Sequence, residues 1–174
     1  ITSETERDSP YRMALLAQDH GGYLNLCALL TRAFLENQHR NRAELRTEWF
    51  EEDGGVRARG LIALSGARSG EVGAQLLAGR FEAATLAAER LEAAFPGRFY
   101  VELQRTGDTR DAACTNASLA LAVKHRLPVV ATHPVQFLRP DDFRAHEARV
   151  CIAQGHVLAD PRRPRPYTVQ QYFT

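Results

Sequence analysis

Pro128-Val129-Val130-Ala131-Thr132 is a short, mostly β-branched run that follows a long Ala- and Leu-rich segment, Asp111 to Arg126. Such a run predicts a strand buried in a sheet, because Val and Thr favour extended backbone. The preceding segment is long and apolar enough to predict a helix. A helix that leads into a buried strand is the repeating unit of α/β proteins.

The same alternation of strands and helices extends along the rest of the chain. Short apolar runs predict three more strands, at Met13 to Ala17, Leu61 to Leu64 and Phe99 to Leu103. We expect the first of these to be buried on both faces of the sheet. Helical spacing of apolar residues, with Gly or Pro at the ends, predicts helices over Glu71 to Ala78, Phe81 to Phe95 and Pro140 to Gln154.

A further helix is predicted directly after the first strand. One stripe at helical spacing, which we expect to face the core, consists of Tyr23, Leu26, Cys27, Leu30 and Phe34. The polar residues 37–41 predict a loop, and so do the Pro- and Arg-rich residues 160–166.

The order of these elements predicts an α/β fold with a mainly parallel sheet, either open or barrel-like. Only about four strands are visible, which is too few to close a barrel. Either the sheet is small or part of the domain lies outside these residues.

Composition limits the function classes. The chain has 174 residues, of which 44% are hydrophobic, so it can bury the core of one domain. Lys and Arg number 22 and Asp and Glu 21, so the net charge of +1 gives no global attraction to nucleic acid. No apolar run approaches the ~20 residues of a membrane span, and the polar residues 1–10 lack the apolar centre of a signal peptide. Three cysteines without a Cys-x-x-Cys pair favour a reduced, cytoplasmic protein.

Common nucleotide-binding and hydrolase motifs are absent from the sequence. It contains neither Gly-x-Gly-x-x-Gly, nor a phosphate loop, nor Gly-x-Ser-x-Gly. The small residues between Leu64 and Glu71 connect a predicted strand to a predicted helix. Two interpretations stay open for them: a turn whose backbone N–H groups bind an anion, or a tight connection in which Gly supplies a positive φ.

Cysteine and histidine spacing predicts no metal site. Cys27, Cys114 and Cys151 are far apart and are interpreted as small buried residues. No two histidines have the short spacing of a metal-binding pair. His133 is the best-placed candidate, because it follows a predicted strand and α/β sites lie at the carboxyl ends of strands. His146 falls within a predicted helix, where a core or surface position is the simpler interpretation.

The stretch from Pro128 to Leu138 resembles the PHP (polymerase and histidinol phosphatase) domain at the N-terminus of bacterial replicative DNA polymerase III alpha subunits. Further matching segments occur in the same order and spacing over nearly the whole chain: Leu15 to Ala17 with Gly22 to Leu26, Gly60 to Gly66 with Gly70 to Val72, Phe99 to Arg105, Ala145 to Glu147, and Asp160 to Arg165 with Tyr167.

The resemblance implies an incomplete, distorted (β/α)7 barrel of the PHP type, with mainly parallel strands alternating with helices. Residues 1–174 are then expected to be a partial PHP domain. Its first barrel strands, including one with a His-x-His metal motif, would precede this chain. The polymerase domains, including the palm with its catalytic aspartates, would follow it.

The resemblance also implies which positions bind metal in hydrolytic members of the family. They correspond here to Thr106, Pro134 and Gln136, where those members have His, Asp and His. Proline has no ligand atom on its side chain, and an amide is a poor ligand for a transition metal. We therefore expect no catalytic residue and no metal site, with His133 as the one remaining candidate ligand.

By this resemblance the chain is expected to be a structural and docking segment of a DNA-directed DNA polymerase, a nucleotidyltransferase that acts in chromosomal DNA replication. The implied partners are the proofreading exonuclease subunit, the rest of the polymerase III holoenzyme and, through the parent protein, DNA. No membrane partner and no cofactor are expected for this segment, whereas Mg²⁺ would serve the separate palm domain.

Two alternatives stay open. The domain could be an active metal-dependent phosphoesterase or 3′→5′ exonuclease that completes its site with upstream ligands. It could also contact DNA weakly through Arg162, Arg163 and Arg165.

Missing strands would leave open sheet edges, so we expect the fragment to cover them by self-association or by rearranging its termini.

Overall fold

The computed structural model describes residues 9–173, and its centre is a four-stranded sheet in the order β1-β4-β5-β6. The strands are β1 (Ala14–Ala17), β4 (Leu61–Leu64), β5 (Phe99–Gln104) and β6 (Val129–Thr132). β4, β5 and β6 are parallel, whereas β1 pairs antiparallel with β4. The coarse prediction of an α/β fold with a parallel-rich sheet is therefore confirmed. The expectation for residues 1–10 falls mostly outside the described residues.

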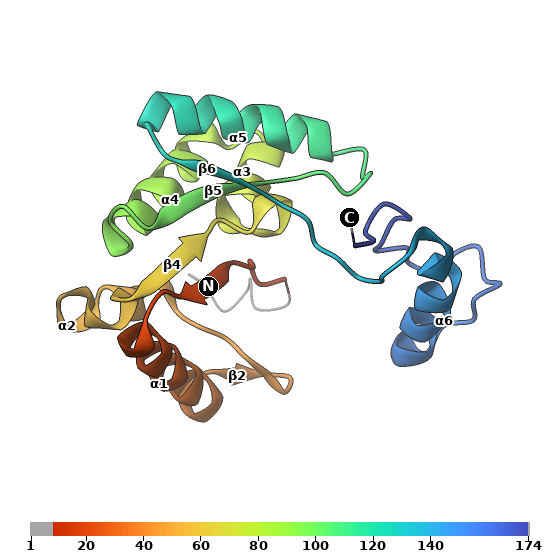
Figure 1. Ribbon diagram of the computed structural model, residues 1–174, viewed down its shortest axis with the longest axis horizontal. Helices are drawn as coiled ribbons and strands as arrows, with labels where there is room; N and C mark the ends of the chain where they lie inside the picture. Colours follow the sequence, from red (N-terminus) through yellow and green to blue (C-terminus); the bar gives the residue numbers. More distant parts are fainter. Residues whose placement is uncertain (1–8, 174) are drawn as a thin grey trace.

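Helices occupy the connections between the strands. They are α1 (His20–Glu36), α3 (Glu71–Leu77), α4 (Phe81–Ala94), α5 (Asp111–His125) and α6 (Phe143–Gln154). Figure 1 shows α3, α4 and α5 gathered over β4, β5 and β6, and α1 beside β1. α6 stands apart from the sheet, at the end of an extended segment that leaves β6. These helices agree closely with the predicted ones.

Shorter elements complete the fold. They are the hairpin strands β2 (Gln38–His39) and β3 (Arg42–Ala43), α2 (Glu52–Gly55), and 3-10 helices over Thr47–Phe50, Val56–Ala58, Ala67–Ser69 and Pro140–Asp142. Within residues 9–173, none of the helices combines the length and hydropathy needed to cross a bilayer.

The core lies where the helices pack on the sheet. Phe95, Phe99 and Val101 are completely buried, and the Phe50 ring lies 5.0 Å from the Phe95 ring. Burying a side chain of this size contributes roughly 1.5–3 kcal/mol. Phe50 therefore anchors the 3-10 helix Thr47–Phe50 to the end of α4.

The position of α1 is set by a close backbone crossing. A Cβ added to Gly22 would lie 1.8 Å from the carbonyl oxygen of Gly60, so only glycine fits there. Asp19 caps the helix by accepting the Gly22 N–H at 2.7 Å. The face of α1 that carries Gly22 is therefore pressed against the chain leading into β4.

Two predictions about these first elements are wrong. β1 is an edge strand rather than a strand buried on both faces, and Leu16 is 49% exposed. The predicted apolar stripe of α1 faces the core only at Leu26, since Tyr23 and Phe34 are each 55% exposed. The buried face instead carries Leu29 and Ala33, which lie in line with Gly22 at helical spacing. The close crossing at Gly22 thus outweighs the apolar stripe.

The prediction of a loop at residues 37–41 is also wrong, because β2 and β3 form an antiparallel hairpin there. Its turn residues Arg40 and Asn41 have φ values of 50° and 63°. Two successive left-handed residues match the twist of a two-residue hairpin. Arg is an unusual choice at such a position, so the sequence gives little indication of this turn.

Candidate functional site at the carboxyl end of the sheet

The three parallel strands end side by side, and a buried carboxylate joins their ends. Glu102 of β5 is 6% exposed. Its Oε2 accepts the Gly66 N–H at 3.0 Å, beyond the end of β4. Its Oε1 accepts hydrogen bonds from Gln104 Nε2, at 2.9 Å, and from the Thr132 hydroxyl on β6. Neutral donors therefore satisfy this carboxylate, which ties the strand ends together.

The turn after β4 is a tight connection. Gly66 has φ +80°, and a Cβ there would lie 1.8 Å from the Arg12 carbonyl oxygen. A Cβ at Gly70 would lie 1.7 Å from the Ser65 carbonyl oxygen. Because the Gly66 N–H already donates to Glu102, the protein's own carboxylate takes the place that an external anion would need. The structure thus supports the second interpretation of this turn.

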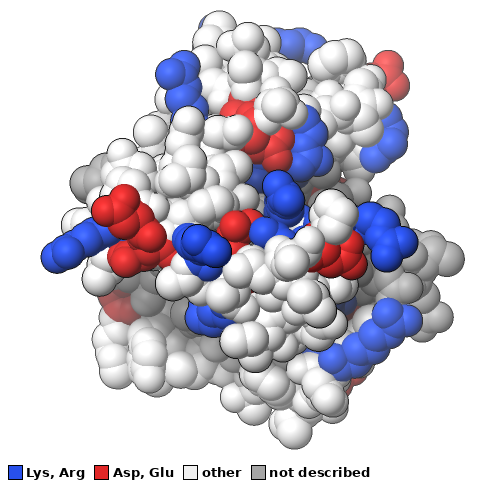
Figure 2. Space-filling model, turned by 90° about the vertical axis from the view of Figure 1, so that its right-hand side faces the viewer, with Lys and Arg blue, Asp and Glu red and all other residues white. Residues whose placement is uncertain are grey.

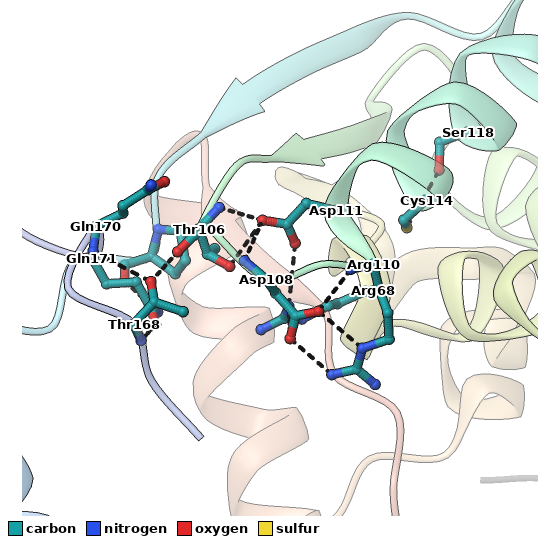
Figure 3. A network of polar contacts seen from close by, with 11 residues as sticks. Arg68, Thr106, Asp108, Arg110, Asp111, Cys114, Ser118, Thr168, Gln170 and Gln171 are labelled. Atoms are coloured by element: carbon teal, nitrogen blue, oxygen red, sulfur yellow. Dashed lines mark hydrogen bonds and ion pairs between the residues drawn. The ribbon is translucent and has the colours of Figure 1, made fainter. Parts of the chain in front are cut away.

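The loop after β5 folds around a second carboxylate (Figure 3). Asp111, at the start of α5, uses Oδ2 to accept the Thr106 N–H at 2.5 Å, the Thr106 hydroxyl at 3.0 Å and the Asp108 N–H at 3.2 Å. Arg68 Nη1 lies 3.2 Å from Asp111 Oδ1 and 2.6 Å from Asp108 Oδ2. Thr106 is 1% exposed, so its side chain serves the loop rather than a ligand.

The ionisable side chains near this loop are suited to structural ion pairs rather than to catalysis. Hydrogen bonds from the Arg110 guanidinium, helped by the charge of Arg68, hold the pKa of Asp108 well below its usual range. Burial raises the pKa of the nearby Cys114 thiol, which lies 4.0 Å from the Ser118 hydroxyl. Asp108 therefore stays ionised and paired, and Cys114 stays protonated, so neither is suited to act as a base or a nucleophile.

The segment after β6 carries the other sequence-predicted positions. Pro134 accepts a hydrogen bond through its carbonyl from Gln171 Nε2 at 3.2 Å, and the Gln136 N–H donates to the Gln171 carbonyl at 2.8 Å. His133 is half-buried, and its Nε2 has no hydrogen-bond partner among the described residues. The structure thus brings Thr106, Pro134 and Gln136 to one end of the sheet, where Pro134 and Gln136 bond through their backbone and Thr106 bonds through both its backbone and its hydroxyl.

Comparison with known proteins identifies the family of the chain. The family model described as PHP domain matches residues 1–106. The chain belongs to the PHP domain family. The segment after β6 and the C-terminal residues, which are also part of the carboxyl-end site, lie outside the matched residues.

Curated relatives of this PHP domain share most of its length. It is 49% identical over 168 residues to a DNA polymerase III subunit alpha of Neisseria meningitidis, covering 95% of this chain and 14% of the relative. It is 45% identical to the corresponding protein of Pseudomonas aeruginosa, over 97% of the chain, and 38% identical to that of Escherichia coli, over 95%. The chain spans about 14% of the length of these relatives.

Residues 9–173 do not by themselves bring a set of metal ligands together. Among residues 9–173, no three His, Cys, Asp or Glu side chains lie together as a group that could hold an ion. His133 Nε2 is one of the buried nitrogens that have no partner among the described residues, and a single imidazole does not make a site. Glu102 and Asp111, the nearby carboxylates, are both taken up by protein donors.

One member of the predicted basic patch is not available to a ligand. Arg163 is 8% exposed, and its guanidinium lies 2.5 Å from Glu147 Oε1 and 3.1 Å from the Leu158 carbonyl. The hydrogen bond to Glu147 raises the pKa of Arg163. Arg162 and Arg165 are exposed. Figure 2 shows basic and acidic side chains interspersed with broad uncharged areas on this face.

Several residues that build the site are missing from the sequence prediction. Asp111 could have been found from its place at the start of a predicted helix shortly after Thr106, where acids often bond to free N–H groups. Thr168 and Gln171 carry no such signal, because their partners lie 62 and 37 residues away along the chain.

Proposed function

We propose that this PHP domain is a structural, non-hydrolytic segment of a bacterial DNA polymerase III alpha subunit. The observation that carries the proposal is the 49% identity to such a subunit over 95% of the chain. The nucleotidyltransferase activity, its Mg²⁺-dependent palm and the role in chromosomal DNA replication belong to the complete parent protein. The cytoplasm is its proposed location.

The finer fold is part of the same proposal. An incomplete, distorted (β/α)7 barrel is supported by the parallel order of β4, β5 and β6 and by two sheet edges, at β1 and β6, that are free of further strands within the described residues. Leu16 on β1 is 49% exposed and Val129 on β6 is 45% exposed. Apolar side chains on open edges support coverage by another part of the parent subunit or by a second copy of this chain.

The non-hydrolytic character rests on the carboxyl end of the sheet. Thr106 is buried against Asp111, Pro134 has no side-chain ligand, and the backbone of Gln136 is bonded to Gln171. A hydrolytic PHP site needs several imidazoles and carboxylates to hold the ions that activate water. Removal of misincorporated nucleotides is therefore assigned to a separate proofreading exonuclease subunit, which docks on this domain within the holoenzyme.

An exonuclease assay tests the absence of hydrolysis. The complete parent subunit, which contains the upstream part of the domain, is incubated with 3′-labelled single-stranded DNA and either Mn²⁺ or Zn²⁺, beside its His133→Ala variant as the matched control. We expect the same background release of label from both proteins. Metal-dependent 3′→5′ release that His133→Ala abolishes would establish the hydrolytic alternative instead. Docking is tested by calorimetry with the exonuclease subunit of the same organism, where saturable binding is expected.

A second candidate function is supported by the two exposed arginines. The Arg162 side chain is 90% exposed, and Arg165 is exposed close to it in the chain. Such side chains can pair with DNA phosphates, and the affinity then falls steeply with salt. If this loop contacts DNA, the combined change of Arg162 and Arg165 to Ala reduces the slope of log affinity against log salt by about 2. An unchanged slope assigns DNA binding to the rest of the parent protein.

A further inference from the structure

Two segments at the carboxyl end of the sheet are joined through the C-terminal residues. The loop after β5 contains Thr106, and the segment after β6 contains Pro134 and Gln136. Beyond Gln104 and Thr132, the last paired residues of β5 and β6, the hydrogen bonds that connect these two segments within residues 9–173 run through residues 168–171.

The contact with the loop after β5 is made by Thr168 and Gln170. The Thr168 hydroxyl donates a hydrogen bond to the carbonyl of Thr106. The side chain of Gln170 lies over Gly107, where an added Cβ would come within 2.8 Å of it. Figure 3 shows these residues approaching Thr106 from the side opposite Asp111. Thr106 is therefore held on two sides, by α5 and by the C-terminal residues.

The contact with the segment after β6 is made by Gln171. Its side chain is almost completely buried, and its Nε2 donates to the Pro134 carbonyl at 3.2 Å. Its Oε1 accepts the Thr168 N–H at 3.0 Å, and its backbone carbonyl accepts the Gln136 N–H at 2.8 Å. The Gln171 side chain thus uses both ends of its amide, one within the turn and one across to the segment after β6.

The next two residues, Tyr172 and Phe173, close the part of the chain that contains α6. Phe137, before α6, and Tyr172, after it, form an isolated parallel bridge. Beside this bridge the Phe173 N–H donates to the Phe137 carbonyl at 3.0 Å. Figure 1 shows α6 away from the sheet, with the C-terminus lying between them. Residues 168–173 therefore lie at the junction between the sheet and α6.

We propose that Thr168 to Gln171 form a latch that closes the carboxyl end of the sheet by cross-linking the loop after β5 to the segment after β6. The inference rests on the proposed non-hydrolytic function. In a hydrolytic domain, bound ions would bridge the positions of Thr106, Pro134 and Gln136, whereas here hydrogen bonds to the latch bridge them. All three positions are bonded to the latch. Opening it would release the loop after β5 and the segment after β6 at the same time.

Hydrogen–deuterium exchange of the 174-residue chain tests the latch. Gln171→Ala removes both side-chain bonds, and Thr168→Val removes the hydroxyl at nearly constant shape. Gln154→Ala, at the exposed end of α6, is the matched control. Each latch variant is expected to speed exchange about tenfold in residues 105–109 and 135–137 together, with β4 and α4 unchanged. The control is expected to behave like wild type.

Three results would overturn the latch: faster exchange in residues 135–137 alone, no change in either segment, or an equal rise throughout the chain in both variants. A separate arm repeats the wild-type experiment with Mn²⁺ and with Zn²⁺. Slower exchange of both segments with metal would contradict the non-hydrolytic function, whereas the variants alone decide the latch. The two failures are therefore distinguishable.

Discussion

Asp111 and Thr106 are bonded twice, through the Thr106 N–H at 2.5 Å and the Thr106 hydroxyl at 3.0 Å, on one carboxylate oxygen. This pair fixes the loop after β5 to the first turn of α5. The position at which hydrolytic relatives are expected to carry a metal-binding histidine is thus filled by a threonine that holds the loop in shape.

Changing Asp111→Ala is expected to destabilise the domain by about 3 kcal/mol, because it leaves the buried donors of Thr106 without an acceptor and Arg68 with one carboxylate fewer. Asp141→Ala is the control, since Asp141 is exposed on the 3-10 helix before α6, and it is expected to cost less than about 0.5 kcal/mol. Urea unfolding measures both. Equal losses for the two variants would show that the Asp111 network does not stabilise the loop.

Neighbouring glycines at the start of α1 provide a second test. Gly22→Ala is expected to cost about 3 kcal/mol, because its Cβ would lie 1.8 Å from the backbone oxygen of Gly60. Gly21→Ala should stay within about 1 kcal/mol of wild type, since its Cβ meets only the Asp19 side chain at 3.2 Å and Ala favours helix. Unfolding free energies compare the two. A tolerated Gly22→Ala would mean that α1 is not fixed by this crossing.

The sequence predicts the features of the fold that depend on residues close together in the chain, and it misses those that depend on distant contacts. The spans of α3 to α6 follow from apolar spacing and from end signals such as Gly155, which adopts the left-handed cap expected of it. Parallel pairing of β4, β5 and β6 follows from their alternation with helices. The inward face of α1 could not be predicted in this way, because it depends on a contact between Gly22 and Gly60. The contacts of Gln171 with Pro134 and Gln136 were equally hidden, since these partners lie far from it along the chain.

The pH dependence of stability should depend on His146. Its ring packs between Phe137, at 5.3 Å, and Tyr167, at 4.8 Å, and its Nδ1 lies 3.3 Å from Arg149 Nη2. Burial, and then the charge of Arg149, lower its pKa, against a weaker opposite effect of Glu147. The unfolded chain therefore takes up a proton first as the pH falls. The stability that the neutral His146 ring contributes is fully present above about pH 6.5, the pKa of His in the unfolded chain. It is lost as the pH falls from that value toward the lower pKa of His146 in the folded protein.

His146→Phe keeps an aromatic ring and removes the proton. Urea unfolding at about pH 7.5 and about pH 5 should show a smaller loss of stability in the variant than in wild type, because the variant lacks this titration. The other histidines are common to both proteins and cancel in the comparison. An equal loss in both proteins would assign the pH dependence to other groups.

Arg163 and Arg162 should differ sharply in their effect on stability. Arg163→Ala leaves the Glu147 carboxylate without its partner and is expected to lower the melting temperature. Arg162→Ala removes an exposed guanidinium 3.6 Å from Asp160 and should leave the melting temperature unchanged. Differential scanning calorimetry gives both values. A lower melting temperature for Arg162→Ala alone would reverse the assignment of the buried and exposed arginines.

Calorimetric titration of Zn²⁺ and of Mn²⁺ into the chain tests most directly whether the carboxyl end of the sheet has lost its metal-binding function. A site built from Thr106, Pro134 and Gln136, with one unpartnered nitrogen on His133, should give no saturable heat, and His133→Ala should give the same trace. Tight binding of two or more ions per chain, lost in His133→Ala, would contradict the structural role proposed for this domain.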